Sequence, residues 1–373
     1  MQKKVLLGMS GGVDSSVSAI LLKKQGYEVI GATMRLWEND VVSKAKNDKA
    51  IEDAKKVCEK LNINHIVFDL HEEFYDDVVK DFIEEYKMGR TPNPCIVCNK
   101  YIKFGSFFKK AKELGIDFVA TGHYAKIEYS KEYNQNVIMK ANEQRKDQTY
   151  FLYGIPKEKL DYIIFPLQNY NSKDEIRKIA LENNLEVAEK KDSQEICFID
   201  EKGYKHFLVK CGKIKPKEGN IVLKNGEVLG KHSGYVNYTI GQRKGLGVSF
   251  KEPLYVIGLN PLKNEVIVGK EQDLYADSLY VTNINWQVPN MEFEGKELFA
   301  KVRYRSKDAK CKIESIKKLE NLENINYIGN IKSNKSEIIK IKFHEPQRAI
   351  TPGQSIVFYD EKGVLLGGGK IEA

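Results

Sequence analysis

The chain has 373 residues, of which 42% are hydrophobic, and it carries a formal net charge of +8 at pH 7. This length exceeds the usual size of a single core, so two or three domains are expected. No apolar run approaches the roughly 20 residues that span a bilayer, and the N-terminal stretch has no secretory signal, which predicts a cytoplasmic protein that does not enter a membrane. The positive charge is compatible with a polyanionic partner such as nucleic acid.

The first part of the chain alternates short apolar strands with helices. Strands are predicted at 3–9, 27–34, 64–70 and 116–124, and helices at 16–26, 50–62 and 72–88. Strands that alternate with helices indicate a parallel sheet with helices on its faces. This part is therefore expected to be an α/β domain, and a further helix is predicted at 173–184.

The later part of the chain is predicted to be mainly β. Asn225-Gly226 between two apolar runs indicates a hairpin, and 254–270 suggests a second one. From residue 278 onward, five or six short strands predict a small closed barrel. The expected division is an α/β domain at 1–205, a small mainly-β central domain at 206–275 and a C-terminal β-barrel at 276–373.

A glycine- and serine-rich turn, "LLGMSGGVDSS" at 6–16, follows the first predicted strand and opens the first predicted helix. Such a turn presents backbone N–H groups to an anion, and Gly11 and Gly12 allow close approach. No lysine follows the glycines, so the usual phosphate-loop pattern is absent. The Asp14 carboxylate beside phosphates would need a bridging cation, which predicts Mg²⁺. The plainer interpretation is an ordinary glycine turn with a helix cap.

Two cysteines are candidates for chemistry. Cys98 lies in "GRTPNPCIVCNKYIKF" (89–104), at the expected start of a helix with two lysines nearby, which favours a thiolate nucleophile. Cys197 lies in "KKDSQEICFID" (190–200), whose acidic residues disfavour a free thiolate but leave it able to accept sulfur as a persulfide.

Three other interpretations of the cysteines remain open. A single C-x-x-C motif is weak support for a structural zinc site, which usually has four protein ligands. Cys95, Cys98 and Cys197 could hold an iron–sulfur cluster, or they could be ordinary half-buried cysteines. The last interpretation is preferred for the remaining three, Cys58, Cys211 and Cys311.

Several segments resemble known proteins. "SGGVDSS" resembles the PP-loop of the ATP pyrophosphatase superfamily, whose members cleave ATP between its α- and β-phosphates and adenylate a second substrate. The longer set resembles the tRNA-uridine 2-thiolation family and comprises "GMSGGVDSS", "RTPNPCIVCNKYIKF", "ATGHYAK", "KDQTYFLY", "KKDSQEICFI", "YTIGQRKGLGV", "VRYRS" and "TPGQSIVFYD". The resemblance implies an adenine nucleotide alpha hydrolase-like fold for the first domain.

The resemblance also implies a mechanism. ATP would activate the wobble uridine of tRNAs of the Lys, Glu and Gln type as an adenylate, with Asp14 in the catalytic machinery. Cys197 would carry a persulfide supplied by a sulfur-donor or relay protein, and Cys98 would release the sulfur and end in a disulfide with Cys197. The implied ATP-site residues are Gly8, Met9, Ser10, Gly11, Gly12, Val13, Asp14, Ser15, Met34 and Gly122.

The resemblance further implies contacts with the anticodon stem-loop. The target base would meet Asn93, Pro94 and Cys95, and other tRNA contacts would be His123, Lys146, Asp147, Gln148, Arg303, Tyr304 and Gln354. A rigid proline loop suits a base that has left its stack, and single-stranded loops suit aromatic and Arg side chains. Considered alone, however, His123 would more often be a core histidine, and "VRYRS", expected in a barrel strand, would be a solvated face.

The chain departs from this family pattern in two places. The loop after the second strand lacks the cysteines that many relatives carry there, and Cys95 replaces an Asp found in some relatives, which makes a Cys95–Cys98 disulfide an alternative. Two other functions are alternatives. One is a PP-loop ligase that adenylates a small molecule, and the other is a non-catalytic RNA-binding or metal-binding module.

Overall fold

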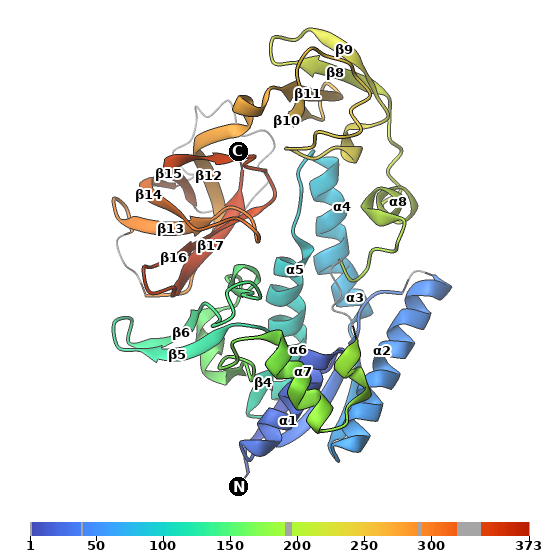
Figure 1. Ribbon diagram of the computed structural model, residues 1–373, viewed down its shortest axis with the longest axis vertical. Helices are drawn as coiled ribbons and strands as arrows, with labels where there is room; N and C mark the ends of the chain where they lie inside the picture. The colour runs from blue at the N-terminus through green and yellow to red at the C-terminus, as the bar shows by residue number, and fades with distance from the viewer. Residues whose placement is uncertain (1, 39, 191–195, 290–292, 319–336, 373) are drawn as a thin grey trace.

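The computed structural model describes residues 2–38, 40–190, 196–289, 293–318 and 337–372 (Figure 1). An N-terminal α/β part lies below a small β-sheet, and a barrel lies beside both. In the ranges described, no helix combines the length and apolar character needed to cross a membrane.

The first part is built on a five-stranded parallel sheet, as the alternating pattern predicted. The strand order is β3-β2-β1-β4-β7. The strands are β1 (Lys4–Gly8), β2 (Glu28–Arg35), β3 (Asn64–Asp69), β4 (Phe118–Ala120) and β7 (Ile163–Ile164). Because the chain leaves β1 toward β2 on one side and later returns to pair β4 on the other, the carboxyl ends of β1 and β4 form a topological switch point, where such sheets bind ligands.

Helices cover both faces of this sheet and divide its core in two. One face packs against α1 (Val13–Lys24), α2 (Val41–Lys60) and α7 (Lys173–Glu182). The other face packs against two long helical runs, whose α-helical parts are α3 (His71–Phe74), α4 (Lys80–Lys87), α5 (Pro94–Val97) and α6 (Phe107–Glu113). Side chains of β1 alternate accordingly, with Leu6 in one core and Val5 and Leu7 in the other.

The helical run that carries Cys98 differs from the prediction. It begins at Pro94, four positions before the expected start at Cys98, because proline fits the first helical position, where no N–H is needed. A nine-residue π-helical stretch, Cys98–Ser106, joins α5 to α6. Cys98 therefore lies inside a continuous helical run and not at its N-terminus.

The central part is a four-stranded sheet preceded by a helix. The elements are α8 (Gly203–Lys210), β8 (Gly219–Leu223), β9 (Val228–His232), β10 (Tyr255–Asn260) and β11 (Glu265–Gly269). Both predicted hairpins are present as antiparallel pairs, β8–β9 and β10–β11, and Gly226 adopts φ +89° in the first turn. A parallel pairing of β8 with β11 joins them, which the sequence pattern did not predict.

The C-terminal part is a closed six-stranded barrel, as predicted. The strands are β12 (Tyr275–Trp286), β13 (Glu297–Lys301), β14 (Ala309–Lys318), β15 (Glu337–Arg348), β16 (Ser355–Tyr359) and β17 (Leu365–Ile371). The expectation that "VRYRS" lies in a strand is wrong. β13 ends at Lys301, and a turn follows in which the Ser306 N–H donates to the Arg303 carbonyl at 3.1 Å.

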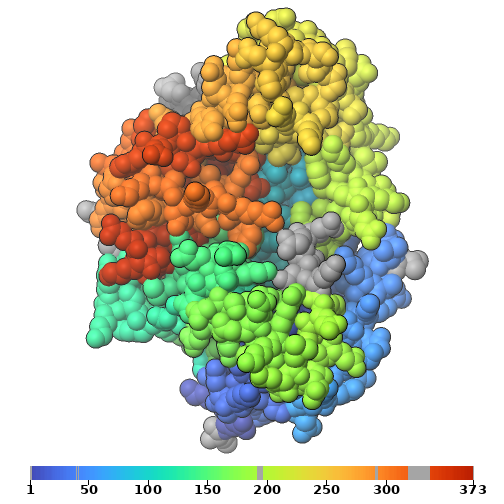
Figure 2. Space-filling view, in the orientation of Figure 1, coloured from blue at the N-terminus to red at the C-terminus, as the bar shows by residue number. Residues whose placement is uncertain are grey.

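The barrel is fixed to the α/β part by buried hydrogen bonds. The Tyr150 hydroxyl donates to the Ser355 carbonyl at 2.8 Å, and the Tyr153 hydroxyl lies 2.9 Å from the Ser355 hydroxyl. The hairpin of β5 (Lys126–Ser130) and β6 (Gln135–Met139) adds a backbone bridge to Val364, and Figure 2 shows its green surface directly beneath the orange and red barrel. The barrel is thereby held in a fixed position beside the carboxyl edge of the parallel sheet.

Candidate active site

The glycine loop lies between β1 and α1, with Gly12 as the N-cap of α1. The Ser10 N–H donates to the Ser15 hydroxyl at 3.3 Å, which closes the turn. Gly11 has φ +66°, and a Cβ there would lie 2.8 Å from the Ala50 carbonyl oxygen of α2, so only glycine fits. Backbone N–H groups at a helix N-terminus in a tight, packed turn form an anion site.

The predicted nucleotide residues come together at the switch point. A Cβ on Gly122 would lie 3.0 Å from the Asp14 carbonyl carbon and 3.1 Å from the Ser15 nitrogen. The Met34 methyl group lies 3.7 Å from where a Cβ on Gly8 would be. Met9 and Val13 are buried, so these two residues offer the site their backbone and not their side chains.

Asp14 has two partners that the sequence analysis missed. Lys173 Nζ, from the first turn of α7, lies 2.6 Å and 2.7 Å from the two carboxylate oxygens of Asp14. The Tyr124 hydroxyl donates to Asp14 Oδ1 at 2.6 Å. Lys173 is buried, with 9% of its surface exposed. No local pattern signals this contact, because the lysine lies 159 positions away on a separate helix.

These contacts bear on the predicted magnesium site. The Asp14 carboxylate already shares its charge with an ammonium group and accepts three hydrogen bonds. Its side chain is 30% exposed, so it faces the loop side of the site. A carboxylate in this state is a weaker metal ligand than a free one, and the structure supplies a protein cation where the sequence predicted Mg²⁺ alone.

Cys98 is buried, and its environment opposes ionisation. Burial raises the pKa of Cys98 to about 12, Lys103 lowers it, and the nearby thiols of Cys197 and Cys95 raise it further. The expected thiolate at a helix N-terminus is thus not found, because the helix begins earlier and desolvation outweighs the lysine. Cys197 thus affects the ionisation of Cys98 although it belongs to a distant segment of the chain.

Cys197 is exposed, in contrast to Cys98. The protein that surrounds it still raises its pKa, to about 11, with a further rise from Cys95 and a lowering by Lys103 and Lys46. Two of the acidic neighbours noted in the sequence, Asp192 and Glu195, lie outside the described residues.

Lys103 is a cation that affects the ionisation of these cysteines. It lowers the pKa of all three cysteines, Cys95, Cys98 and Cys197. Its Nζ lies 3.4 Å from Nε2 of His123, whose Nδ1 lies 2.7 Å from the Thr121 hydroxyl. Since Lys103 can only donate, Nε2 accepts from it and Nδ1–H donates to Thr121.

The environment of His123 fits that arrangement. Burial and the charge of Lys103 lower the pKa of His123 well below its usual value, so the ring is neutral. The histidine is thus a buried, satisfied residue that orients Lys103. Its predicted contact with tRNA stays a prediction.

Contacts of Gly122 and His123 link the glycine loop to Lys103, whose charge affects the cysteines. Gly122 packs on Asp14, the next residue His123 holds Lys103, and Lys103 acts on the thiols. Within the described ranges, no three His, Cys, Asp or Glu side chains are grouped to hold a metal ion. In this conformation the described cysteines therefore do not fit an iron–sulfur cluster.

The proline loop before Cys95 is held by the barrel. Gln354 Nε2 donates to the Thr91 carbonyl at 2.8 Å, and the Thr91 N–H donates to the Pro352 carbonyl at 2.9 Å. The predicted base-contacting residues Asn93 and Pro94 follow directly, and Asn93 is the N-cap of α5. Gln354 thus has a structural partner in addition to its predicted contact with tRNA.

Other predicted tRNA residues are engaged within the protein. The buried Asp147 carboxylate accepts from the Ala141 N–H at 3.0 Å, and Gln148 Oε1 accepts from the Tyr124 N–H at 3.0 Å. Lys146, the preceding residue, also has a partner. Arg303 donates to the Ala349 carbonyl at 2.6 Å, and the Tyr304 ring packs 4.4 Å from that of Phe151. Contact of these residues with tRNA stays a prediction.

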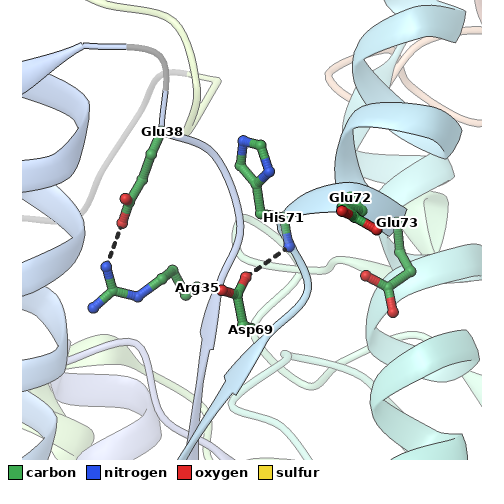
Figure 3. Close-up of a pocket in the computed structure, with 6 residues that line it drawn as sticks. All are labelled: Arg35, Glu38, Asp69, His71, Glu72 and Glu73. Carbon is green, nitrogen blue, oxygen red and sulfur yellow. Dashed lines mark hydrogen bonds and ion pairs between the residues drawn. The ribbon is translucent and has the colours of Figure 1, made fainter.

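Apart from this site, a hollow lies at the carboxyl ends of β2 and β3 (Figure 3). It encloses about 520 Å³ and is lined by Arg35, Glu38, Asp69, His71, Glu72 and Glu73. Arg35 pairs with Glu38 at 2.7 Å and with Asp48 at 3.1 Å, so its charge is already neutralised. Nothing else there points to a ligand, and the hollow is assigned no function.

Similarity to known proteins extends over the whole chain. Family models described as the tRNA methyl transferase HUP domain, the tRNA methyl transferase PRC-barrel domain and the aminomethyltransferase β-barrel domain match residues 3–201, 205–270 and 322–371. Proteins named tRNA-specific 2-thiouridylase MnmA are similar from end to end. One from Caldicellulosiruptor saccharolyticus is 46% identical over 100% of this chain and 99% of its own length. One from Clostridioides difficile is 43% identical with the same coverage.

Proposed function

The chain belongs to the tRNA-specific 2-thiouridylase family, and from that membership we propose how its own residues perform the reaction. The protein is a tRNA-uridine 2-sulfurtransferase of the ATP-using PP-loop class. The observation that supports the mechanism is the linkage of the two sites through one segment: Gly122 packs on Asp14, His123 lies 3.4 Å from Lys103, and the charge of Lys103 lowers the pKa of Cys98. It joins a site for phosphates to a site for sulfur.

The first step is adenylation of the uridine. O2 of the base attacks the α-phosphorus of ATP, the bond to the β-phosphate breaks, and pyrophosphate leaves. The backbone N–H groups of residues 10–15 would hold the leaving group, and Mg²⁺ would enter bound to the nucleotide phosphates. Met34 and Gly8 would border the adenine. Lys173 would supply the positive charge that the loop sequence lacks, with Asp14 and Tyr124 fixing its position.

The second step transfers sulfur. Cys197 carries a persulfide, and the Cys98 thiolate attacks its inner sulfur, which forms the Cys98–Cys197 disulfide and releases hydrosulfide. The hydrosulfide attacks C2 of the adenylated uridine and expels AMP with the former O2. A dithiol reductant then supplies two electrons to reopen the disulfide. Lys103 supports this step because it is the cation that lowers the pKa of the attacking Cys98 thiol.

We favour the persulfide route over a cluster route. Among the described residues no His, Cys, Asp and Glu side chains are grouped to hold a metal ion, and the Cys197 thiol raises the pKa of Cys98. Thiols of this kind stay reduced in the cytoplasm, which is the location that we propose. We further propose the wobble uridine of Lys-, Glu- and Gln-type tRNAs as the target, and domains at 1–205, 206–275 and 276–373.

Isotope labelling tests the adenylation step directly. A tRNA transcript with ¹⁸O at the uridine O2 positions is incubated with the enzyme, ATP and sulfide, and the AMP is analysed by mass spectrometry. The mechanism requires that AMP carries ¹⁸O in proportion to the 2-thiouridine formed. AMP without the label would show that the uridine oxygen is not the group that ATP activates.

A further inference from the structure

A second lysine, Lys190, reaches the glycine loop from a distant segment. Its Nζ donates to the Gly11 carbonyl at 2.9 Å, although the two residues lie 179 positions apart. The mechanism above does not use this contact. Lys190 follows the short 3₁₀ turn Glu186–Glu189 and precedes Cys197 by seven positions. The contact therefore joins the segment that leads to the proposed sulfur carrier with the loop expected to hold phosphate.

Asp53 of α2 holds the Lys190 side chain in this position. Its carboxylate lies 2.8 Å from Lys190 Nζ, and its side chain is 22% exposed. Gly11 packs on the same part of α2, since a Cβ on Gly11 would lie 3.0 Å from the Asp53 Cβ and 2.8 Å from the Ala50 carbonyl oxygen. The ammonium group thus has two oxygen partners, one on the helix and one in the loop.

The contact sets the orientation of one peptide group. The peptide bond between Gly11 and Gly12 is trans, since the described residues include no cis peptide bond. In a trans peptide the carbonyl oxygen and the amide hydrogen point in opposite directions. Because the Gly11 carbonyl points to Lys190, the Gly12 N–H points away from it. Within the described ranges, this N–H donates to no protein group and is therefore available to a ligand.

A peptide between two glycines rotates easily unless a contact holds it. Rotation by about 180° would change only ψ of Gly11 and φ of Gly12, and glycine accepts both changes at little steric cost. The rotated peptide would present a carbonyl oxygen to phosphate in place of an N–H. A hydrogen bond from an ammonium group opposes this rotation, because a charge-assisted bond is roughly twice as strong as a neutral one.

We propose that Lys190 is a positioning residue that fixes the Gly11–Gly12 peptide, so that the Gly12 N–H donates to the pyrophosphate that leaves ATP. The inference rests on the proposed adenylation step. Negative charge develops on the leaving group as its bond to the α-phosphorus breaks. A donor that is already aimed at this charge stabilises the transition state without reorganisation. Lys190 acts through the peptide and does not need to touch the nucleotide.

Selective labelling makes this one peptide visible by NMR. Gly-Gly pairs occur in the chain only at 11–12, 367–368 and 368–369. In protein grown with glycine that carries ¹³C at the carbonyl and ¹⁵N at the amide, the carbonyl–amide correlation therefore appears only for the amides of Gly12, Gly368 and Gly369. The first signal reports the Gly11 carbonyl together with the Gly12 amide. The other two arise from β17 and serve as internal references.

Variants of Lys190 test the orientation of the peptide. Lys190→Met should displace or split the Gly12 signal and leave the two reference signals in place, whereas Lys190→Arg keeps a charged donor and should resemble the wild type. Lys56→Met is the matched control, because it removes the same charge from α2 at a side chain that is 59% exposed and pairs with Glu52. An unchanged Gly12 signal in Lys190→Met would overturn the proposal.

The same signal tests the ligand. Addition of Mg²⁺ and inorganic pyrophosphate should shift the Gly12 signal of the wild type and leave the reference signals in place. The apparent Kd from this titration should be about tenfold higher in Lys190→Met, the cost expected for one charge-assisted hydrogen bond. A wild-type Gly12 signal that does not respond to pyrophosphate would overturn the proposal.

Kinetics separate this role from a merely structural one. Lys190→Met should lower the kcat of tRNA-dependent pyrophosphate release by about 10²-fold, the cost of losing one preorganised donor, with the KM for tRNA kept. Normal pyrophosphate release with slower thiolation would show that Lys190 only anchors the segment before Cys197, and would overturn the proposal. If the wild type formed no AMP although pyrophosphate shifted the Gly12 signal, the proposed function would fail and the orientation of the peptide would stand.

Discussion

Lys173 and Asp14 form a close ion pair across 159 positions of the chain, with Nζ 2.6 Å and 2.7 Å from the two carboxylate oxygens. Asp14 lies in the first turn of α1, next to the N–H groups expected to hold phosphate. The usual phosphate loop has a lysine within its own motif, and this loop has none. In this fold the cation that pairs with Asp14 beside the loop is Lys173, which comes from α7, near the end of the α/β part of the chain.

This pair predicts a strong effect of Lys173→Met on ATP cleavage. Removal of a preorganised charge beside a developing negative charge costs about 10²–10³ in rate. We expect pyrophosphate release to fall by that factor while tRNA binding is kept. Lys178→Met is the matched control, because Lys178 lies on the same helix with 78% of its side chain exposed. A normal rate of pyrophosphate release in Lys173→Met would remove the lysine from the mechanism.

The two cysteines should separate the two half-reactions. Cys197→Ser should abolish thiolation from a persulfide donor yet still form AMP-activated tRNA, because the serine cannot carry sulfane sulfur and the PP-loop is untouched. Nucleoside mass spectrometry and pyrophosphate release measure the two steps. Cys311→Ala, in the barrel core, is the control and should keep both activities. Full thiolation by Cys197→Ser would refute its role as the sulfur carrier.

The cysteine pKa values predict a pH dependence. Burial raises the pKa of Cys98 to about 12 and surrounding protein raises that of Cys197 to about 11, so both thiols are protonated near neutral pH. Below the pKa, the thiolate fraction rises about tenfold per pH unit, and the rate of persulfide cleavage should rise with it. Lys103→Met should slow this cleavage at each pH, because it removes the cation that lowers the pKa of the attacking Cys98 thiol. A cleavage rate in the wild type that levels off near neutral pH would contradict these values.

Gln354 should act through the proline loop as well as through RNA. Its amide donates to the Thr91 carbonyl at 2.8 Å and so links the barrel to the segment before Cys95. Gln354→Ala should lower the kcat of tRNA-dependent AMP formation roughly fivefold, because the lost hydrogen bond has a net worth of about 1 kcal/mol. The glutamate in Gln354→Glu cannot donate this hydrogen bond, so this variant should show the same fall in kcat as Gln354→Ala. A change confined to the KM for tRNA would show that Gln354 contacts RNA without ordering the loop.

The architecture could be predicted because its signals are local. Alternating strands and helices predicted the parallel sheet, and short spaced strands predicted the barrel, which closes with six strands. Asn225-Gly226 predicted its hairpin for a similar reason, since the turn needs a residue that tolerates positive φ. The loop, Met34 and Gly122 also lie close together, and their role in holding a nucleotide stays a prediction.

The chemistry of the site depends on contacts between distant segments, and these gave no signal in the sequence. Cys98 was expected to be a thiolate at a helix N-terminus, but Pro94 starts the helix one turn earlier and burial then dominates. His123 orients Lys103 through a contact over 20 positions. The contact of Lys173 with Asp14 was missed because nothing in the sequence around Lys173 distinguishes this residue from other lysines at the start of a helix.

The central claim is that ATP cleavage and sulfur transfer meet on one tRNA uridine, and one assay tests it most directly. Enzyme purified without oxygen is incubated with unmodified tRNA transcripts, Mg-ATP and a persulfide donor, and the nucleosides and nucleotides are analysed together. The account predicts 2-thiouridine and AMP in equal amounts, with no metal cluster in the active sample. ADP in place of AMP, or AMP without 2-thiouridine, would contradict it.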